Sequence, residues 1–336
     1  MIDTLERLLS QQALARAGSA GLGECLRAMV SQGLDQLPLP ASGQTLARWQ
    51  ALAEVAGHSL GLCKLYEGHT DALAIIQELD APAVPNGSTW GMWAAEPPQA
   101  RLRVSAAGAG LRVDGLKAWC SGAAVLSHAL VTAWDEQGCQ QLVAVPLAQT
   151  GVQVTDDGWH AVGMAATASV EVRFDQASGW AVGGPGDYLQ RPGFWQGAIG
   201  IAACWYGAAS ALALSLPAQL STRPEPHGLA HLGAVDAALS SASLVLQDAA
   251  KQLDDRTVNN YELLARRSRA SVENTVETVI QHVGRALGAG PYCKDAGFAR
   301  MAADLPVFIR QSHAERDLAT LGEQVVQTRA HRGWRL

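Results

Sequence analysis

Apolar residues recur every three or four positions in the first part of the chain, which is the spacing that places them on one face of an α-helix. Leu5 and Leu8 belong to one such stripe. A later helix from about His69 should stop before Pro82, because proline disfavours helical backbone in the residue that precedes it. We therefore predict a helical N-terminal domain over residues 1–82, in which no catalytic motif stands out.

The pattern changes between about residues 83 and 182, where short apolar runs are separated by Gly, Pro and Asp. Several short strands at this spacing, with no helical pattern between them, indicate an antiparallel barrel or sandwich rather than a parallel sheet. The predicted strands cover residues 90–95, 100–104, 111–113, 117–121, 129–133, 141–146, 152–155 and 170–174.

Helical periodicity returns over residues 183–336. No charged residue lies between Arg191 and Arg223, a length that could span a bilayer. This stretch is nevertheless rich in Ala, Gly and Ser, and Pro217 interrupts its end, so we interpret it as the buried central helix of a bundle. Further helices are expected over about 232–253 and 259–287, followed by a final pair.

Composition narrows the class of protein. The formal net charge of −6, from 31 acidic and 25 basic residues, argues against a nucleic-acid partner. The six cysteines form no C-x-x-C pair, so we expect neither a zinc site nor disulfides, and reduced thiols favour the cytoplasm. The charged N-terminus is unlike a signal peptide. His58, Glu67 and His69 suggest a metal site, but helix ends and surface loops explain them equally well.

One stretch in the β region has the composition of a ligand wall. Asp114-Gly115 predicts a tight turn, and the strand after it contains Trp119, Ser121 and Gly122. A flat aromatic surface, a hydroxyl two residues on along the same side and an open glycine suit a planar heterocycle with polar edges. The alternative is a hairpin in which Trp119 is ordinary sheet core.

The order of helices, β domain and helical bundle resembles the acyl-CoA dehydrogenase family. Short motifs carry the resemblance. Ala95-Glu-Pro97 looks like the family's Thr-Glu-Pro, and Gly115-Leu-Lys-Ala-Trp-Cys-Ser-Gly122 resembles its Gly-x-Lys-x-Trp strand. Gly163-Met-Ala-Ala-Thr-Ala-Ser169 and Gly284-Arg-Ala-Leu-Gly-Ala-Gly-Pro-Tyr292 are similar to two further family segments. The resemblance implies an α+β multidomain fold, with an antiparallel β-barrel over residues 83–182 and a C-terminal four-helix bundle over 183–336.

The resemblance also implies FAD as cofactor and assigns residues to it. Trp119 and Ser121 match the positions that line the isoalloxazine ring. Arg223 is the nearest match to an arginine that binds the adenosine diphosphate portion. Gly288 and Ala289 match a turn that contacts that portion across a subunit interface, which implies a homodimer or homotetramer. Arg191 matches an arginine near the acyl pocket and is a candidate substrate-binding residue.

The sequence departs from the family where the chemistry matters most. The flavin-binding Thr is Ala95, and the position of the catalytic glutamate falls near Ser312, with Gln190 at the alternative location. His313 or Glu315 could serve as the base after a small shift of register, or these residues could form a polar helix face. Loss of a general base without replacement typically costs ~10²–10⁴-fold in rate.

We therefore expect an FAD-dependent oxidoreductase that removes hydrogen from the α and β carbons of an acyl thioester, with an unassigned electron-transfer partner. Two alternatives stay open. A monooxygenase or oxidase of the same fold would keep the flavin but use oxygen, and a catalytically degenerate member would serve as a structural or binding protein.

Overall fold

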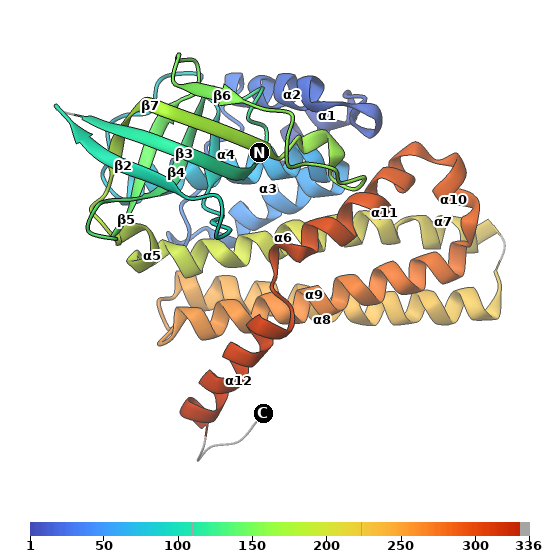
Figure 1. The fold of residues 1–336 in the computed structure, drawn as a ribbon. Helices are drawn as coiled ribbons and strands as arrows, with labels where there is room; N and C mark the ends of the chain where they lie inside the picture. The colour runs from blue at the N-terminus through green and yellow to red at the C-terminus, as the bar shows by residue number, and fades with distance from the viewer. Residues whose placement is uncertain (109, 223, 330–336) are drawn as a thin grey trace.

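The computed structural model describes residues 1–108, 110–222 and 224–329. Figure 1 shows a β-barrel above a group of long helices, and the N-terminal helices lie beside the barrel and pack against both parts. The order of helices, barrel and helices along the chain is the order predicted from the sequence.

The N-terminal helices pack through the apolar stripes that predicted them, and Leu5, Leu8 and Leu9 are all buried. α4 begins nine residues earlier than expected, because the Ser59 hydroxyl accepts a hydrogen bond from Leu62 N at 3.2 Å and caps the helix there. The helices of this region are α1 (Ile2–Ser10), η1 (Leu14–Arg16), α2 (Ser19–Ser31), α3 (Thr45–His58) and α4 (Leu60–Glu78).

Seven strands form one sheet, and β4 pairs with both β2 and β5, so that β4, β2, β3, β7 and β5 close into a barrel. The predicted barrel is confirmed, but it is not wholly antiparallel, because β1 and β2 both pair with β4 in parallel. The strands are β1 (Trp90–Trp93), β2 (Leu102–Ala107), β3 (Gly110–Cys120), β4 (His128–Trp134), β5 (Gln140–Pro146), β6 (Val152–Val154) and β7 (Val170–Val182).

The predicted turn at Asp114-Gly115 is wrong, because β3 runs straight through it. Gly115 has a φ of 121° and marks a register shift in the pairing of β3 with β7. A Cβ there would lie 2.9 Å from the carbonyl oxygen of Arg101, so only glycine allows the strands to approach. The connection from β2 to β3 instead lies between Ala107 and Gly110, which pair with each other.

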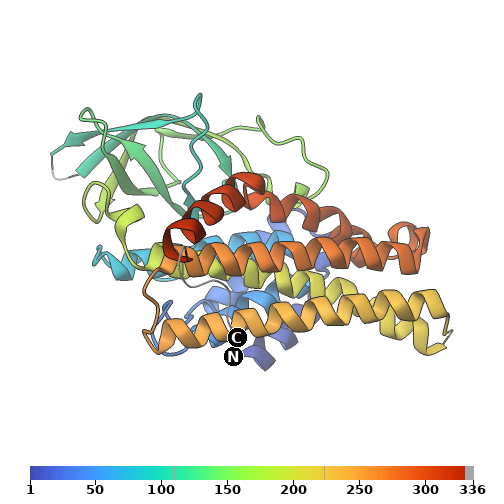
Figure 2. The ribbon, with the colours of Figure 1, turned by 90° about the horizontal axis from the view of Figure 1, so that it is seen from below.

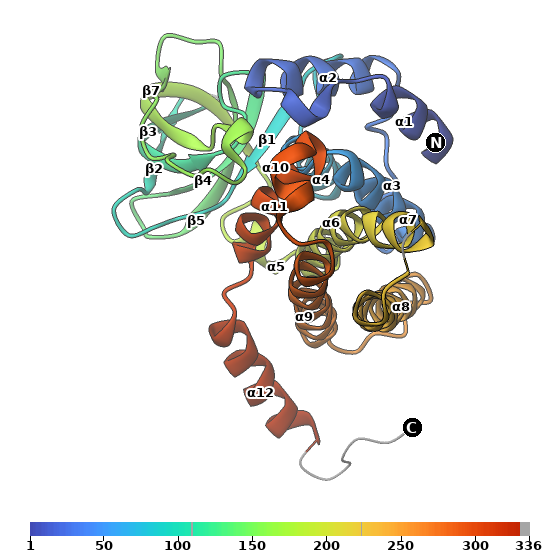
Figure 3. The same ribbon diagram turned by 90° about the vertical axis from the view of Figure 1, so that its right-hand side faces the viewer.

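The uncharged stretch forms α6, the central helix of the helical layer, as predicted. α6 packs against both α3 and α9, and Figures 2 and 3 show α3 running beside the C-terminal helices. An N-terminal helix therefore contributes to the bundle. The helices are α5 (Asp187–Gln190), α6 (Gly193–Ala213), α7 (Ser215–Thr222), α8 (Pro226–Asp254), α9 (Tyr261–Leu287), α10 (Ala289–Lys294), α11 (Ala296–Phe308) and α12 (Glu315–Arg329).

Two helical segments are long and apolar enough to cross a membrane by length and composition. In the segment Gly193–Thr222, 61% of the most apolar window is buried inside the protein, as in the core helix of a soluble fold. In Pro226–Asp254 only 17% is buried, so α8 presents an apolar face outward. α12 also projects away from the body of the protein (Figures 1 and 3).

Candidate functional site

A cavity of about 1570 Å³ lies where the barrel meets the helical layer. Its walls come from β1, the end of β3, α3, α4, α6, α9 and the segment over residues 307–318. Ligand pockets typically measure about 300–1000 Å³. The cavity therefore has room for a cofactor together with a second molecule.

Trp119 presents its indole to this cavity. It is the second-last residue of β3, and its φ of 59° is unusual for a bulky side chain. A register shift between Lys117 and Cys120 accompanies this conformation, and the side chain is 54% exposed although its neighbours in the strand are buried. The backbone thus turns a large aromatic surface out of the sheet, as the sequence hypothesis of a ligand wall requires.

Beside this tryptophan, hydroxyl groups form a short chain. Ser121 Oγ lies 2.7 Å from Ser169 Oγ, which lies 2.8 Å from Thr167 Oγ1. Thr167 belongs to η2 (Ala165–Thr167), and the backbone N–H of the preceding Met164 donates to Asp304 Oδ1 at 2.5 Å. A helix of the C-terminal part thereby fixes the hydroxyl groups that face the cavity.

Lys117 and Glu96 form the polar interior beneath the wall. Lys117 is fully buried and donates to the carbonyl oxygen and hydroxyl of Thr132 at 3.0 and 2.7 Å. Burial lowers the pKa of Lys117 to about 8, and the nearby Glu96 carboxylate opposes that shift. Glu96 itself lines the cavity, and its buried Oε1 has no hydrogen-bond partner. This end of the cavity can therefore accept a hydrogen bond from a ligand edge.

Arg191 lies in the cavity wall, as expected for a substrate-binding residue. It directly precedes the head of α6, is buried, and donates to Glu78 Oε2 at 2.7 Å. Its guanidinium also lies over the ring of Tyr188. Its buried Nε–H has no acceptor. The side chain is thus held in place by α4 and α5 while a donor is left unmatched.

The candidate base positions lie together at one side of the cavity. Ser312 is buried, and its hydroxyl accepts a hydrogen bond from Ala314 N at 3.1 Å. The side chain of His313 is 64% exposed and its ring lies 3.8 Å from Asp317, while Glu315 is exposed at the start of α12. Gln190 ends α5 and is exposed. The two titratable candidates are therefore in contact with solvent rather than enclosed.

The cavity contains a polar stripe that the sequence reasoning missed. Lys64, Glu67 and Asp71, spaced by three and four residues, share one face of α4 and all line the cavity. Burial raises the pKa of Asp71, whereas Arg191 and Arg48 favour its ionised form. The sequence did contain a signal for this stripe, because its charged residues recur at helical spacing inside an otherwise apolar helix.

The predicted contacts to an adenosine diphosphate group do not meet the cavity within one chain. Gly288 and Ala289 are exposed at the end of α9. Glu277, on the same helix, is the cavity-lining residue of α9 nearest to this end. At 1.5 Å per residue Gly288 is ~17 Å further along the axis. Arg223 lies outside the described residues.

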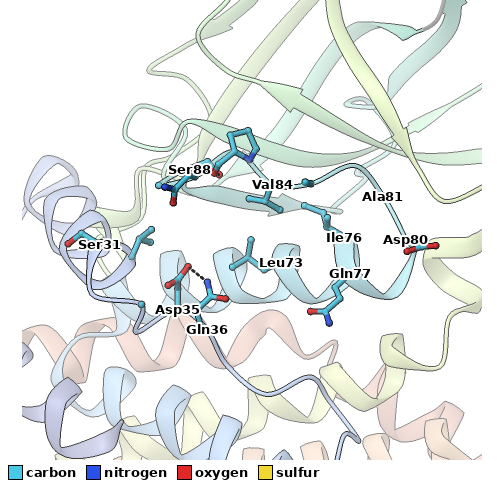
Figure 4. A pocket seen from close by; sticks show the side chains of 16 residues that line it. Ser31, Asp35, Gln36, Leu73, Ile76, Gln77, Asp80, Ala81, Val84 and Ser88 are labelled. Atoms are coloured by element: carbon cyan, nitrogen blue, oxygen red, sulfur yellow. Dashed lines mark hydrogen bonds between the residues drawn. The ribbon is translucent and has the colours of Figure 1, made fainter.

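A second cavity, of about 720 Å³, lies on the opposite side of α4 (Figure 4). Leu73 and Ile76 of α4 face it, and Asp35 accepts a hydrogen bond from Gln36 Nε2 at 3.1 Å. Asp35 also lies 3.2 Å from His69 Nε2, and the other ring nitrogen of His69 accepts from Trp90 N. His69 therefore joins the N-terminal helices to β1. The described residues contain no cluster of three or more side chains suited to a metal ion.

Comparison of the sequence with protein-family models and with curated proteins gives no match. The fold, in contrast, resembles several solved structures over nearly the whole chain. Methanesulfinate monooxygenase MsuC from Pseudomonas fluorescens has a TM-score of 0.80 at 18% identity, covering 97% of this chain and 96% of that one. FMN-bound TdsC, a dibenzothiophene monooxygenase from Paenibacillus sp. A11-2, has a TM-score of 0.79 at 17% identity, covering 98% and 97%.

A nitrososynthase from Micromonospora carbonacea var. africana has a TM-score of 0.79 at 17% identity, covering 96% of this chain and 95% of that one. These proteins are flavin enzymes with the acyl-CoA dehydrogenase fold. The chain therefore has that fold, as its sequence motifs predicted, and identities this low establish the fold alone.

Proposed function

We propose that this protein is a flavin-dependent monooxygenase that oxidises a small polar molecule. The observation that carries the proposal is the charged stripe of α4 inside the cavity, because an aliphatic acyl chain would be poorly accommodated against Lys64, Glu67 and Asp71. The fold of MsuC and TdsC, both named as monooxygenases, supports the same class. Acyl thioester dehydrogenation, the function favoured by the sequence, is the competing outcome of the test below.

The residues around Trp119 fit a flavin ring. The exposed indole offers a stacking surface, and the hydroxyls of Ser121 and Ser169 offer hydrogen bonds. Glu96 Oε1, which lies 3.8 Å from Lys117 Nζ but accepts no hydrogen bond, offers an acceptor. We propose FMN rather than FAD, since TdsC has been solved with FMN. FAD bound across a subunit interface remains the alternative.

When bound, the flavin supplies two-electron redox chemistry and, once reduced, a reaction with dioxygen. Overall, one oxygen atom of dioxygen would enter the substrate and the other would leave as water, with two electrons delivered by a separate reductase and two protons taken from solvent. The protein's own part is placement. Trp119 and Ser121 orient the ring, Arg191 and the α4 stripe hold the substrate, and buried Ser312 closes the side of the cavity next to α12.

We also propose that the protein forms a homodimer or homotetramer through α8. Most of this helix is apolar and outward-facing, with Leu229 and Leu244 exposed. Apolar surface of this extent on a helix of a soluble protein is usually covered by a partner, and a second copy of this chain is the partner available to every molecule.

The function is tested by mixing the FMN-loaded protein, without oxygen, with butyryl-, octanoyl- and palmitoyl-CoA. We expect no bleaching of the flavin absorbance by any thioester. We expect the chemically reduced form to be reoxidised within seconds by air-saturated buffer. Bleaching by one acyl-CoA contradicts the proposal and establishes dehydrogenation, which would direct the search for a base to His313 and Glu315. Absence of flavin binding would leave a structural or binding protein.

A further inference from the structure

α4 lies between the two cavities. The face that it turns toward the barrel and the second cavity is held in place by hydrogen bonds. His69, Leu73 and Ile76 face the barrel and the second cavity, where His69 bonds to both Asp35 and Trp90. The opposite face presents the α4 stripe to the large cavity. Because the anchored face fixes the rotation of the helix, the stripe is held toward the cavity.

The cations around the stripe already have acceptors within the protein. Lys64 Nζ donates to Glu67 at 3.0 Å, and Arg191 donates to Glu78 at 2.7 Å. Arg48 donates to the carbonyl oxygen of Thr70 at 3.1 Å. Arg269 likewise donates to Ala198 O at 2.8 Å and lies over the ring of Trp205. Each of these cations therefore has at least one acceptor within the protein, although the Nε–H of Arg191 has none.

Asp71 differs from them. Among the described residues, no side chain or backbone group donates a hydrogen bond to its carboxylate. The carboxylate lines the large cavity, with Gly197 of α6 opposite it, where an added Cβ would be in ordinary contact with Oδ1 at 3.5 Å. A carboxylate in a cavity with several acceptor sites and no donor is a group that a ligand can satisfy.

The local charges indicate which kind of donor is missing. The cavity lining contains seven Arg and Lys side chains and seven Asp and Glu side chains, so its formal charge is balanced with Asp71 ionised. An added ammonium or carboxylate would unbalance this set in a poorly solvated place. A neutral N–H or O–H donor would satisfy Asp71 without adding charge.

We propose that Asp71 is the substrate-anchoring residue, and that the substrate is a neutral molecule that donates an O–H or N–H hydrogen bond to it. This inference rests on the proposed function, because it assigns the second molecule in the flavin cavity. It gives the α4 stripe a role in specificity, since a site built to accept a hydrogen bond discriminates strongly against an analogue that lacks the donor.

The test uses the full-length protein at pH 8 and four probes of similar shape: benzyl alcohol, benzaldehyde, benzylamine and benzoate. Binding is followed by the shift of the thermal midpoint of the flavin-free protein and by perturbation of the spectrum of the FMN-loaded protein. We expect benzyl alcohol to bind at least tenfold more tightly than the other three. Asp71→Leu should abolish this preference, and Asp71→Asn, which keeps one acceptor oxygen, should retain part of it.

If Asp71 had only a structural role, Asp71→Leu would lower the thermal midpoint. Because the carboxylate has no partner to lose, Asp71→Leu should keep or raise the thermal midpoint. Glu54→Gln, on α3 and paired with His58, is the matched control and should bind all four probes as wild type does.

The inference is overturned if the probes bind equally, if benzylamine or benzoate binds best, or if Asp71→Leu keeps the preference. FMN titration of the same variants separates this failure from that of the proposed function. Normal FMN binding without the preference rejects only the role of Asp71, whereas no FMN binding in any variant rejects the flavin site itself.

Discussion

Gly207 of α6 lies directly against the backbone of α3. A Cβ at this position would collide with the carbonyl oxygen of Ala53 and lie 2.6 Å from the Ala53 Cα. Carbon atoms prefer separations of about 3.5–4.0 Å, so Gly207→Ala must push the two helices apart by about 1 Å. Both helices carry residues of the cavity wall, including Leu52 and Gly200.

The change in stability caused by Gly207→Ala is the sum of two opposing contributions. Forced overpacking in a well-packed core costs about 1–3 kcal/mol or more, and replacing glycine by alanine inside a helix contributes about 1 kcal/mol of stability. Gly57, on α3, offers a matched control within the same interface. A Cβ on Gly57 would make ordinary contacts of 3.6 Å with Ala211 and Gly207. Gly57→Ala should therefore be neutral or stabilising by up to about 1 kcal/mol.

Urea unfolding of both variants, followed by tryptophan fluorescence, measures the difference. We expect Gly207→Ala to unfold at lower urea with an unchanged slope, and to be less stable than Gly57→Ala by about 1–3 kcal/mol. If Gly207→Ala is as stable as Gly57→Ala, α3 and α6 do not cross at this distance, and the packing that joins the N-terminal helices to the bundle is wrong.

Three further predictions concern the wall, the barrel interior and the surface. Trp119→Leu should weaken FMN binding about tenfold, or about 1.4 kcal/mol, through loss of stacking, as measured by fluorescence titration. Lys117 has a pKa of about 8 in the folded protein against 10.5 normally. The unfolded chain therefore binds more protons between these values, and stability should rise by about 3 kcal/mol from pH 8 to 10.5. Lys117→Met should remove this rise in urea unfolding. Leu244→Glu should convert the oligomer to a monomer in light scattering.

Each of these three predictions would be contradicted by a specific result. Unchanged FMN affinity in Trp119→Leu would place the ring elsewhere in the cavity. A wild-type stability that does not rise over this pH range relative to Lys117→Met would mean that burial does not lower the pKa of the amine. An unchanged mass for Leu244→Glu, or a monomeric wild type, would leave α8 outside any interface.

The elements of the fold were largely predictable, because each depends on local periodicity. The alternating runs gave the strands, and the absence of charge between Arg191 and Arg223 indicated the buried α6. Asp114-Gly115 was misread because the same dipeptide suits a turn and a bulge. Only the pairing of β3 with both β2 and β7 decides between them, and that pairing is not local in sequence.

The site was predictable only where a motif marked it. The strand motif identified Trp119 and Ser121, and the head of α6 identified Arg191, all of which line the cavity. The α4 stripe was missed because its meaning depends on which face of α4 is turned toward the cavity. His69 settles that rotation through a contact with Asp35, which is 34 residues away in the sequence.

The most direct test of the account is a titration of the flavin-free protein with FMN, followed by flavin fluorescence and absorbance, with FAD titrated in parallel. The account predicts saturable binding of one FMN per chain, tighter than FAD, with spectral changes typical of a ring stacked on an indole. Tighter binding of FAD, dependent on oligomer formation, would favour a cofactor site shared between subunits. Failure of both flavins to bind would contradict the central claim that the wall formed by Trp119 and the neighbouring hydroxyls is a flavin site.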